Sequence, residues 1–595
     1  MEEIHKQLGN FLDEPEKYVI SVSDWYPHSA NNYASEDFSV GGKFHFSRPP
    51  GPDDEEHILT SPEGVRNGEL FFWSALINRK GKHPDIMIYP YMKSRLNIFT
   101  IETGEVYRFR LIGASNFMMR FSIDEHQLEV IATDGYLIQP VTTDYIFFHS
   151  GERYDFLLRA KNDTQVANKT DYWIRAELLA IDVDGYPFRP IRGSAPYPLL
   201  SQYYSADAIL HYNAPGTQPP KSSEYEAIRN ASIPHSSKCT RENLCLAVNC
   251  PLRFHPNYYM NCTFTHQLKL LFPAPIHERP LNEPEPEKGR EIFFNFASEG
   301  LGHFVSVNGR MLRFPSVPLQ IIADDAERQQ IRDQEFCSND PEICQTAGFY
   351  TVFPECTCVY TEELPVFGST NRLVLANVLQ DTYNHPIHFH GHNFFVMDMG
   401  FPEYNSTTGI RGCYSPDINC NEPEGVDRCK YAENPTHQGI SYSCNYPKWE
   451  NGHQPSYGNP SSKIDAYTVR KDTVVIPTGG YVVIQFLANN PGYWFMHCHI
   501  GLHSEDGMAV IINEAPDRHN PPPPGMRTCG NFSWSLEDFY TSLSAAEEMN
   551  YGPDATTSLS VEDESIDSVD ENGPNSAGIK LAVPRQMVCR AYLHP

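Results

Sequence analysis

Short runs in which apolar and polar residues alternate recur along the first third of the chain. They cover residues 18–26, 106–111, 119–124, 130–132 and 172–176, with Gly, Asp and Asn between them. Because successive side chains of an extended strand point to opposite faces, each run predicts a strand with one buried face. Many short strands, without a long stretch of helical period, predict an all-β sandwich or barrel.

The same kind of pattern returns in the second half of the chain. Strands are predicted at residues 293–296, 304–309, 372–377 and 481–487. Residues 213–290, between the two groups of strands, are rich in Pro, Cys and Glu and show little periodicity. This stretch therefore predicts a connector that is stapled by disulfides.

These patterns divide the chain into two β domains, residues 17–212 and residues 291–515, with the connector between them. Residues 516–595 begin with a proline-rich run and continue as a tail rich in Ser, Asp and Glu. Such a composition cannot bury enough apolar surface to form a core. We expect a disordered, acidic, low-complexity tail.

Charge limits the partners of the protein. The 595 residues carry a net charge of −29, which argues against nucleic acid or an anionic membrane surface because phosphate groups would be repelled. No apolar run reaches the roughly 18 residues that a membrane span needs. The first residues show neither the basic nor the apolar segment of a signal peptide.

The stretch from Tyr493 to Met508 carries the strongest chemical signal. Cys498 is followed by His503 after five residues and by Met508 after ten. These are three ligands of a trigonal copper site with two histidines, one cysteine and a weak axial sulfur. His497 and His499 flank the cysteine, and on a strand they face away from it together, towards a second metal centre.

A second histidine segment runs from His385 to His392. His388 and His390 share one face of a strand, whereas His385 lies an odd number of residues away, beside Pro386, and can turn the other way. That provides the missing imidazole of the Cys498 site. A lone pair of alternate histidines is commonly a surface feature, but two such segments with Cys, His and Met at this spacing are far more specific.

The two segments resemble the paired HPxHxHG and HCHxxxHxxxxM motifs of the multicopper oxidases, specifically the laccase type. The resemblance implies cupredoxin-like (plastocyanin-like) Greek-key domains and bound copper. It assigns His385, Cys498, His503 and axial Met508 to the type 1 copper, His388 to the type 2 copper, and His390, His497 and His499 to the type 3 pair. It also makes the edge of His503 the electron entry point and Cys498, with His497 and His499, the path to the cluster. His392 matches no ligand position.

The resemblance extends to the first β domain. Residues 107–112 and 151–155 are similar to the middle cupredoxin domain of the family, which carries no metal ligands. We therefore expect the isolated histidines of this domain to be structural or surface residues: His45, His57, His83, His126 and His149.

The family's trinuclear cluster uses eight histidines, of which this chain supplies four. The others belong to HxHG and HxH motifs of a first cupredoxin domain, and no HxH occurs between Met1 and Asn384. Residues 1–16 then read as a linker from a missing first domain, whose histidines the trinuclear site needs.

The function that the resemblance implies is one-electron oxidation of phenols, diphenols or aromatic amines, coupled to reduction of O₂ to water. A metallo-oxidase acting on Fe(II) or Cu(I) is the first alternative, which acidic residues near the type 1 histidines would favour. A non-enzymatic copper or electron-transfer protein is the second, although it has no reason to carry the four cluster histidines. Glu505 and Asp506 either orient His503 or form a solvated turn.

Cysteine usage favours an extracellular protein. Apart from Cys498, the other 14 of the 15 cysteines could form seven disulfides. Buried reduced thiols, or a zinc site at Cys356 and Cys358, are the alternatives. Six N-glycosylation sequons point the same way, at Asn162, Asn168, Asn230, Asn261, Asn405 and Asn531. We expect a secreted glycoprotein, and the lack of a visible signal peptide suggests that the true beginning is missing.

Overall fold

The structure is a computed structural model. It describes residues 2–25, 74–81, 95–178, 205–214, 216–252, 259–285, 287–299, 304–315, 318–321, 336–337, 357–378, 384–403, 413–420, 444–451, 464–505 and 507–521. The chain divides into two compact units, one of Met1–Arg313 and Ile331–Asn520 and the other of Phe314–Gln330 and Pro521–Pro595. Within the described residues, no helix is both long and apolar enough to span a membrane.

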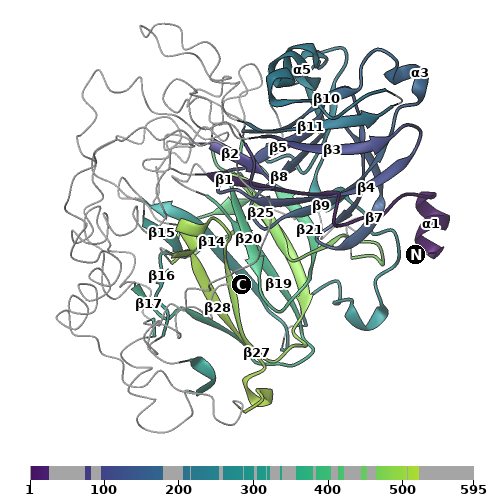
Figure 1. The fold of residues 1–595 in the computed structure, drawn as a ribbon. Helices are drawn as coiled ribbons and strands as arrows, with labels where there is room; N and C mark the ends of the chain where they lie inside the picture. The colour runs from purple at the N-terminus through teal and green to yellow at the C-terminus, as the bar shows by residue number, and fades with distance from the viewer. Residues whose placement is uncertain are drawn as a thin grey trace, which may run out of the picture. The chain divides into compact units, whose positions relative to one another are not determined.

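Two sheets form what we call the first sandwich (Figure 1). Their strand orders are β2-β1-β4-β9-β6-β7 and β13-β12-β8-β5-β10-β11-β3. The strands are β1 (Val19–Trp25), β2 (Ser74–Ile77), β3 (Asn97–Glu102), β4 (Val106–Ala114), β5 (Met119–Ile123), β6 (Leu128–Thr133), β7 (Tyr136–Thr143), β8 (Tyr145–Phe148), β9 (Arg153–Arg159), β10 (Asp171–Leu178), β11 (Ser205–Asn213), β12 (Cys245–Val248) and β13 (Met260–Thr263).

Aromatic residues from facing strands fill the first sandwich. In β4, every second residue is buried, so that Phe109 points into the core. Its ring stacks on Phe156 of β9 at 5.3 Å, and Phe156 lies 5.5 Å from Phe121 of the opposite sheet. The alternation read from the sequence is therefore the alternation between core and solvent, and the predicted all-β fold is confirmed.

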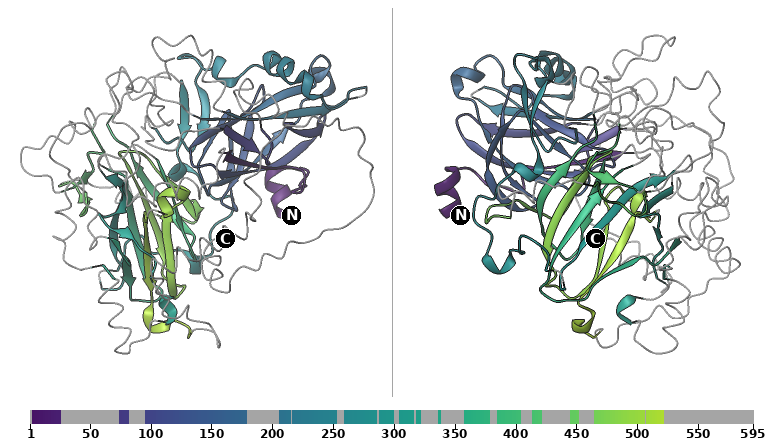
Figure 2. Two further views of the ribbon diagram at one scale, coloured as in Figure 1. Left: turned by 60° about the vertical axis from the view of Figure 1, so that its left-hand side comes forward. Right: turned by 180° about the vertical axis from the view of Figure 1, so that it is seen from behind.

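The second sandwich contains β20 and β27, the strands of the two histidine segments. Figure 2 shows this sandwich in teal to yellow-green. Its sheets have the orders β15-β14-β19-β26-β21-β24 and β18-β28-β27-β20-β25. The strands are β14 (Glu291–Glu299), β15 (Phe304–Val307), β18 (Thr361–Leu364), β19 (Thr370–Ala376), β20 (His385–Phe389), β21 (Phe394–Gly400), β24 (Arg470–Lys471), β25 (Thr473–Ile476), β26 (Tyr481–Leu487), β27 (Gly492–Cys498) and β28 (Ala509–Glu514).

Smaller elements complete the described chain. Two short strand pairs are β16 (Met311–Leu312) with β17 (Thr357–Cys358), and β22 (Ile418–Asn419) with β23 (Lys448–Trp449). The helices are α1 (Glu2–Leu8), α3 (Asp163–Val166), α5 (Tyr225–Ala231) and α9 (Gly501–Glu505). The 3₁₀ turns are η2 (Ser222–Glu224), η3 (His235–Ser237), η4 (Thr265–Gln267), η5 (Ile276–Glu278), η7 (Leu319–Ile321) and η11 (Pro516–Arg518).

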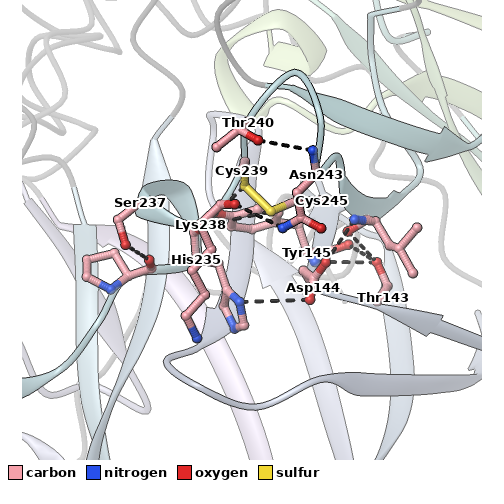
Figure 3. Close-up of a disulfide and its surroundings, with 12 residues drawn as sticks. Thr143, Asp144, Tyr145, His235, Ser237, Lys238, Cys239, Thr240, Asn243 and Cys245 are labelled. Atoms are coloured by element: carbon pink, nitrogen blue, oxygen red, sulfur yellow. Dashed lines mark hydrogen bonds and ion pairs between the residues drawn. A yellow bond between two sulfur atoms is a disulfide. The ribbon is translucent and has the colours of Figure 1, made fainter.

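The connector has more regular structure than its sequence predicts. Its strands β12 and β13 pair in parallel and extend a sheet of the first sandwich through β8. The disulfide Cys239–Cys245 closes the loop before β12, and the His235 ring beside it lies 3.8 Å from the Asp144 carboxylate (Figure 3). The expectation of a connector stapled by disulfides holds. Its two strands, of four residues each, are too short to show a period in the sequence.

A buried cluster of charges joins the two sandwiches. The Lys471 ammonium of β24 lies 3.1 Å from Asp134 and 3.3 Å from Glu152, and all three side chains are fully buried. Lys471 also donates to the Thr133 hydroxyl at 2.7 Å. Asp134 and Glu152 belong to the first sandwich, so one cation of the second sandwich neutralises two carboxylates across the boundary.

Replacing this cation tests how strongly the sandwiches depend on each other. We expect Lys471→Met to lower the free energy of unfolding by about 3–5 kcal/mol, since removing one partner of a buried ion pair leaves uncompensated charge. Urea unfolding followed by tryptophan fluorescence measures the loss. The matched control is Lys269→Met, whose 3.2 Å pair with Asp465 is 42% and 53% exposed and contributes at most about 1 kcal/mol. Equal losses in the two variants would contradict the interpretation.

Candidate metal centre

Three side chains from neighbouring elements converge on one point of the second sandwich. The Cys498 sulfur, at the end of β27, lies 3.5 Å from Nδ1 of His385, the first residue of β20. It lies 3.7 Å from Nδ1 of His503 in α9, and the two Nδ1 atoms are 3.3 Å apart. Cys498 is a buried free thiol. Two imidazole nitrogens and a sulfur thus face one another around a small central space.

The spacing of these atoms fits a metal ion. Three ligands at about 2.0–2.3 Å from an ion, arranged in a trigonal plane, lie roughly 3.5–4.0 Å from one another. The observed separations run from 3.3 to 3.7 Å. A thiolate with two imidazoles is the donor set that copper prefers in such a plane. The residues present therefore fit copper.

Met508 closes the segment that starts at Cys498. Its backbone oxygen accepts a hydrogen bond from Cys498 N at 3.0 Å, and its own N–H donates to the His503 carbonyl at 2.8 Å. The Met508 side chain is fully buried. These two backbone hydrogen bonds hold Met508 next to Cys498 and His503, and its side chain is as buried as the Cys498 thiol.

Four other histidines gather on the opposite face of the same two strands. In the antiparallel pairing of β20 with β27, His388 is opposite His497 and Ile387 is opposite Cys498. The His388 ring centroid lies 4.7 Å from that of His390, 5.8 Å from His497 and 5.9 Å from His499. Nε2 of His390 and Nε2 of His497 are 3.2 Å apart. We call these four residues the histidine cluster.

Hydrogen bonds to Nδ1 orient three of the four rings. His388 uses Nδ1 toward the Asp472 carbonyl at 2.9 Å. Nδ1 of His497 lies 2.8 Å from the Cys498 carbonyl, and Nδ1 of His499 lies 3.0 Å from the Ser150 hydroxyl. With Nδ1 engaged, Nε2 remains as the ligand atom of each ring, which is how outer partners orient metal-binding histidines.

Burial is the main cause that keeps His390, His497 and His499 neutral. With smaller contributions from neighbouring histidines, it lowers the pKa of His497 to about 3 and that of His390 to about 4. The pKa of His499 is also lowered, mainly by burial. Because a neutral imidazole offers a lone pair and an imidazolium does not, the rings are in the form that binds metal near neutral pH.

His392 takes a different role from its neighbours in the segment. Its Nε2 lies 2.6 Å from the Glu514 carboxylate at the end of β28, and both side chains are buried. The ring also packs on Phe486 of the opposite sheet at 4.9 Å. The pair ties the turn after β20 to the last strand of the same sheet. Glu505 is exposed at the end of α9, and Asp506 lies outside the described residues.

His149 is a buried structural histidine, as expected, but it also lies beside the second sandwich, which the sequence did not indicate. This residue of the first sandwich is 2% exposed, and its pKa is held well below the ordinary value, first by burial and then by His385, His503 and His499 of the second sandwich. Ser150 and Arg153 of the same turn also reach the second sandwich. Sequence reasoning missed them because Ser150 and His499 are 349 residues apart.

His126, another described histidine of the first sandwich, is bonded within that sandwich. His126 is buried and holds the Tyr212 hydroxyl at 2.7 Å through Nε2, as expected for a structural residue. His45, His57 and His83 lie outside the described residues.

Four disulfides occur among the described residues: Cys239–Cys245, Cys250–Cys262, Cys337–Cys358 and Cys420–Cys444. The zinc alternative at Cys356 and Cys358 is wrong, because Cys358 is bonded to Cys337.

Comparison with known proteins gives the same picture at the level of the family. Laccase-24 of Oryza sativa subsp. japonica is 24% identical over 449 residues, which cover 72% of this chain and 62% of the relative. The iron transport multicopper oxidase fio1 of Schizosaccharomyces pombe is 23% identical over 515 residues, covering 85% of this chain and 57% of the relative. The solved structure of Fet3p, a multicopper oxidase that functions in iron import, has a TM-score of 0.49 at 17% identity and covers 91% of this chain and 72% of that one.

The aligned region covers only part of each relative but a large part of this chain. The aligned part of the chain spans about three-fifths of the two sequence relatives. The multicopper oxidase family matches residues 16–187 and again residues 326–518. The second match contains both histidine segments. The chain belongs to the multicopper oxidase family.

Proposed function

We propose that this chain is the copper-binding part of a laccase-type oxidase, which removes single electrons from phenols, diphenols or aromatic amines and passes them to O₂. The family implies a copper-dependent oxidoreductase with O₂ as acceptor. The observation that carries the proposal is the placement of two groups of metal-ligating side chains on opposite faces of β20 and β27.

In this proposal the first group holds the type 1 copper and the histidine cluster holds half of the trinuclear site. His385, Cys498 and His503 supply the trigonal ligands, and Met508 the weak axial one. His388 serves the type 2 copper, and His390, His497 and His499 serve the type 3 pair. Copper bound by the thiolate accepts and releases one electron at a time, and its potential depends on the axial ligand.

Burial decides where electrons enter. His385 is fully buried, whereas His503 is partly exposed. Nδ1 of His503 faces the Cys498 sulfur, so the opposite edge of the ring points away from the ligand group. We assign that edge as the contact for the reducing substrate. His385 has no comparable access, which makes it a holding ligand.

The chain connects the two metal groups directly. Cys498 is bonded through the backbone to both His497 and His499, and its carbonyl oxygen lies 2.8 Å from Nδ1 of His497. That contact shortens the route from the thiolate to the cluster compared with the covalent path alone. With copper bound, the same strand would hold the metal on one face and offer this route to the histidine cluster on the other.

Reduction of O₂ requires more histidine ligands than the cluster offers. The cluster offers four imidazoles, and the family's trinuclear site uses eight. We propose that the other four come from a cupredoxin domain with HxHG and HxH motifs, placed against the cluster. Its role is to enclose O₂ among the ligands and to keep water out.

A metallo-oxidase is the second candidate. Asn116 of the first sandwich accepts a hydrogen bond from Gly501 N of α9 at 3.2 Å, and its own N–H donates to the Asp24 carboxylate at 2.6 Å. A carboxylate is thus held two hydrogen bonds away from the helix that carries His503, where it would attract Fe(II) or Cu(I). Comparing kcat/KM for Fe(II) and for a diphenol decides between the two substrate classes.

We further propose that the protein is secreted and glycosylated. The disulfides of the described residues support an oxidising compartment. Of the sequons, Asn168, Asn230 and Asn261 lie in exposed positions. Asn162 caps α3, where its side-chain oxygen accepts from Gln165 N at 3.1 Å, and Asn405 and Asn531 lie outside the described residues.

The type 1 assignment predicts a colour. Copper-loaded protein should show an intense visible band, and Cys498→Ser should abolish it because the band requires the thiolate. Absorption and electron paramagnetic resonance spectra measure both. His497→Ala is the control, since its ring belongs to the other face and the band should persist. A folded, copper-loaded protein without the band before mutation would refute the assignment.

The cluster assignment predicts incomplete catalysis. These 595 residues should reduce the type 1 copper stoichiometrically with a diphenol but show negligible oxygen uptake in an oxygen electrode. Adding a cupredoxin domain that carries HxHG and HxH should restore turnover, and His497→Ala should then remove it while leaving the blue band. Sustained oxygen consumption by the chain alone, with four coppers bound, would contradict the proposal.

The disulfide assignment predicts few free thiols. In protein from a secretory host, titration under denaturing conditions should find little beyond the Cys498 thiol. A count near all 15 cysteines would overturn both the disulfides and the extracellular location.

A further inference from the structure

The turn between β8 and β9 of the first sandwich, His149–Glu152, is held in a fixed shape. Gly151 N donates to the Gly113 carbonyl at 3.0 Å, and Gly113 N donates to the Glu152 carbonyl at 2.9 Å, so the turn is pinned to β4. The Glu152 carboxylate accepts from His149 N at 3.1 Å and from the Asn249 amide at 2.8 Å. The turn is therefore a rigid support.

His149 reaches the segment that begins with His385. Ser150 N donates to Nδ1 of His149 at 2.8 Å, so Nδ1 is the acceptor and the ring proton sits on Nε2. The ring makes its other hydrogen bond to the backbone of Asn384, the residue before His385. Asn384 is itself fixed, because its side-chain oxygen accepts from Thr478 N at 2.8 Å.

The next two residues of the turn contact His499. The Ser150 hydroxyl lies 3.0 Å from Nδ1 of His499. Gly151 has φ of +82°, and a Cβ added to it would come within 2.8 Å of His499 Cδ2. The backbone thus packs directly on the imidazole. A larger residue at this position would both strain the turn and push the ring.

Arg153, which follows the turn, reaches Asp472, the residue between β24 and β25 whose carbonyl contacts His388. Its guanidinium makes a bidentate pair with the Asp472 carboxylate, at 2.6 Å for each nitrogen–oxygen contact. The Asp472 carbonyl accepts from Nδ1 of His388 at 2.9 Å. It also accepts from Phe389 N at 3.1 Å. Through Arg153, the first sandwich therefore helps to fix the position of β20 around His388.

We propose that His149 and Ser150 of the first sandwich are positioning residues for the copper ligands His385 and His499. The inference rests on the proposed function of those ligands. An interface that only joined two domains would need buried area and paired charges, which Lys471 and its carboxylates provide. The turn instead makes hydrogen bonds to the ring of His499 and to Asn384, the residue before His385. Outer partners of this kind typically change metal affinity by about 10- to 100-fold when removed.

The first test uses the type 1 site, whose ligands are all present in this chain. His149→Leu should weaken copper binding roughly 10-fold or more in competition with a chelator, and should shift the type 1 reduction potential and the visible band. His149→Gln should retain most of the native values, because an amide can accept from Ser150 N and donate to the Asn384 carbonyl. Thermal midpoints show that the variants are folded.

The second test isolates His499 in a Cys498→Ser background, in which the histidine cluster is titrated with Cu(II) and followed by electron paramagnetic resonance. Ser150→Ala should lower the affinity, and Ser150→Thr should restore it because the hydroxyl returns. The matched control is Ser205→Ala, which removes a 2.8 Å bond to Asp207 elsewhere in the first sandwich and should change nothing.

The outcomes of these tests distinguish failure of the positioning role from failure of the proposed copper sites. Native affinity, band and potential in His149→Leu, together with native affinity in Ser150→Ala, would overturn the positioning role while leaving the copper sites intact. A parent chain that shows neither the blue band nor Cu(II) binding by the cluster would overturn the proposed function itself. Equal losses in Ser205→Ala and Ser150→Ala would also reject the positioning role, because the effect would then be general.

Discussion

The copper chemistry of this chain depends on the antiparallel register of β20 and β27. His388 is opposite His497 and Ile387 is opposite Cys498, so one pair of strands presents a thiol on one face and a group of imidazoles on the other. Because side chains alternate, a slip of a single residue would exchange the faces and bury the wrong groups. The neighbouring strands β25 and β28 fix that register, since each pairs with one of the two. The hydrogen bonds between four strands thus determine the separation of the two groups of side chains.

The arrangement also requires burial, because burial keeps the imidazole rings uncharged. The rings of His390 and His497 remain neutral because burial lowers the pKa of each, which preserves the lone pairs that bind metal. Burying so many polar groups demands partners, and the first sandwich provides several of them. Ser150 contacts His499, and Asp134 with Glu152 surrounds Lys471. Among the described residues, the first sandwich therefore contacts the histidine cluster through a hydrogen bond and is joined to the second sandwich by a balanced group of buried charges.

The sequence predicted the part of this arrangement that local spacing determines. Alternation located β4, β5, β10 and β26 closely, and the parity of residues around Cys498 and His388 predicted the two faces of the strands. It could not predict β12 and β13, where disulfides replace periodicity as the stabilising constraint. Nor could it find Ser150, since a contact across 349 residues leaves no local pattern in a single sequence. His149 looked isolated for the same reason.

His385 and His503 face the same sulfur from elements that differ in burial. Both rings present Nδ1 to the same sulfur, at 3.5 and 3.7 Å, so coordination alone does not distinguish them. His385 is fixed in a strand beside Asn384, which the first sandwich supports, and it is completely buried. His503 sits in a helix of five residues and is partly exposed. If the proposed type 1 assignment holds, the buried imidazole would fix the geometry of the copper and the partly exposed one would meet the reductant. The difference in burial between the two elements would then let one copper be both constrained and accessible.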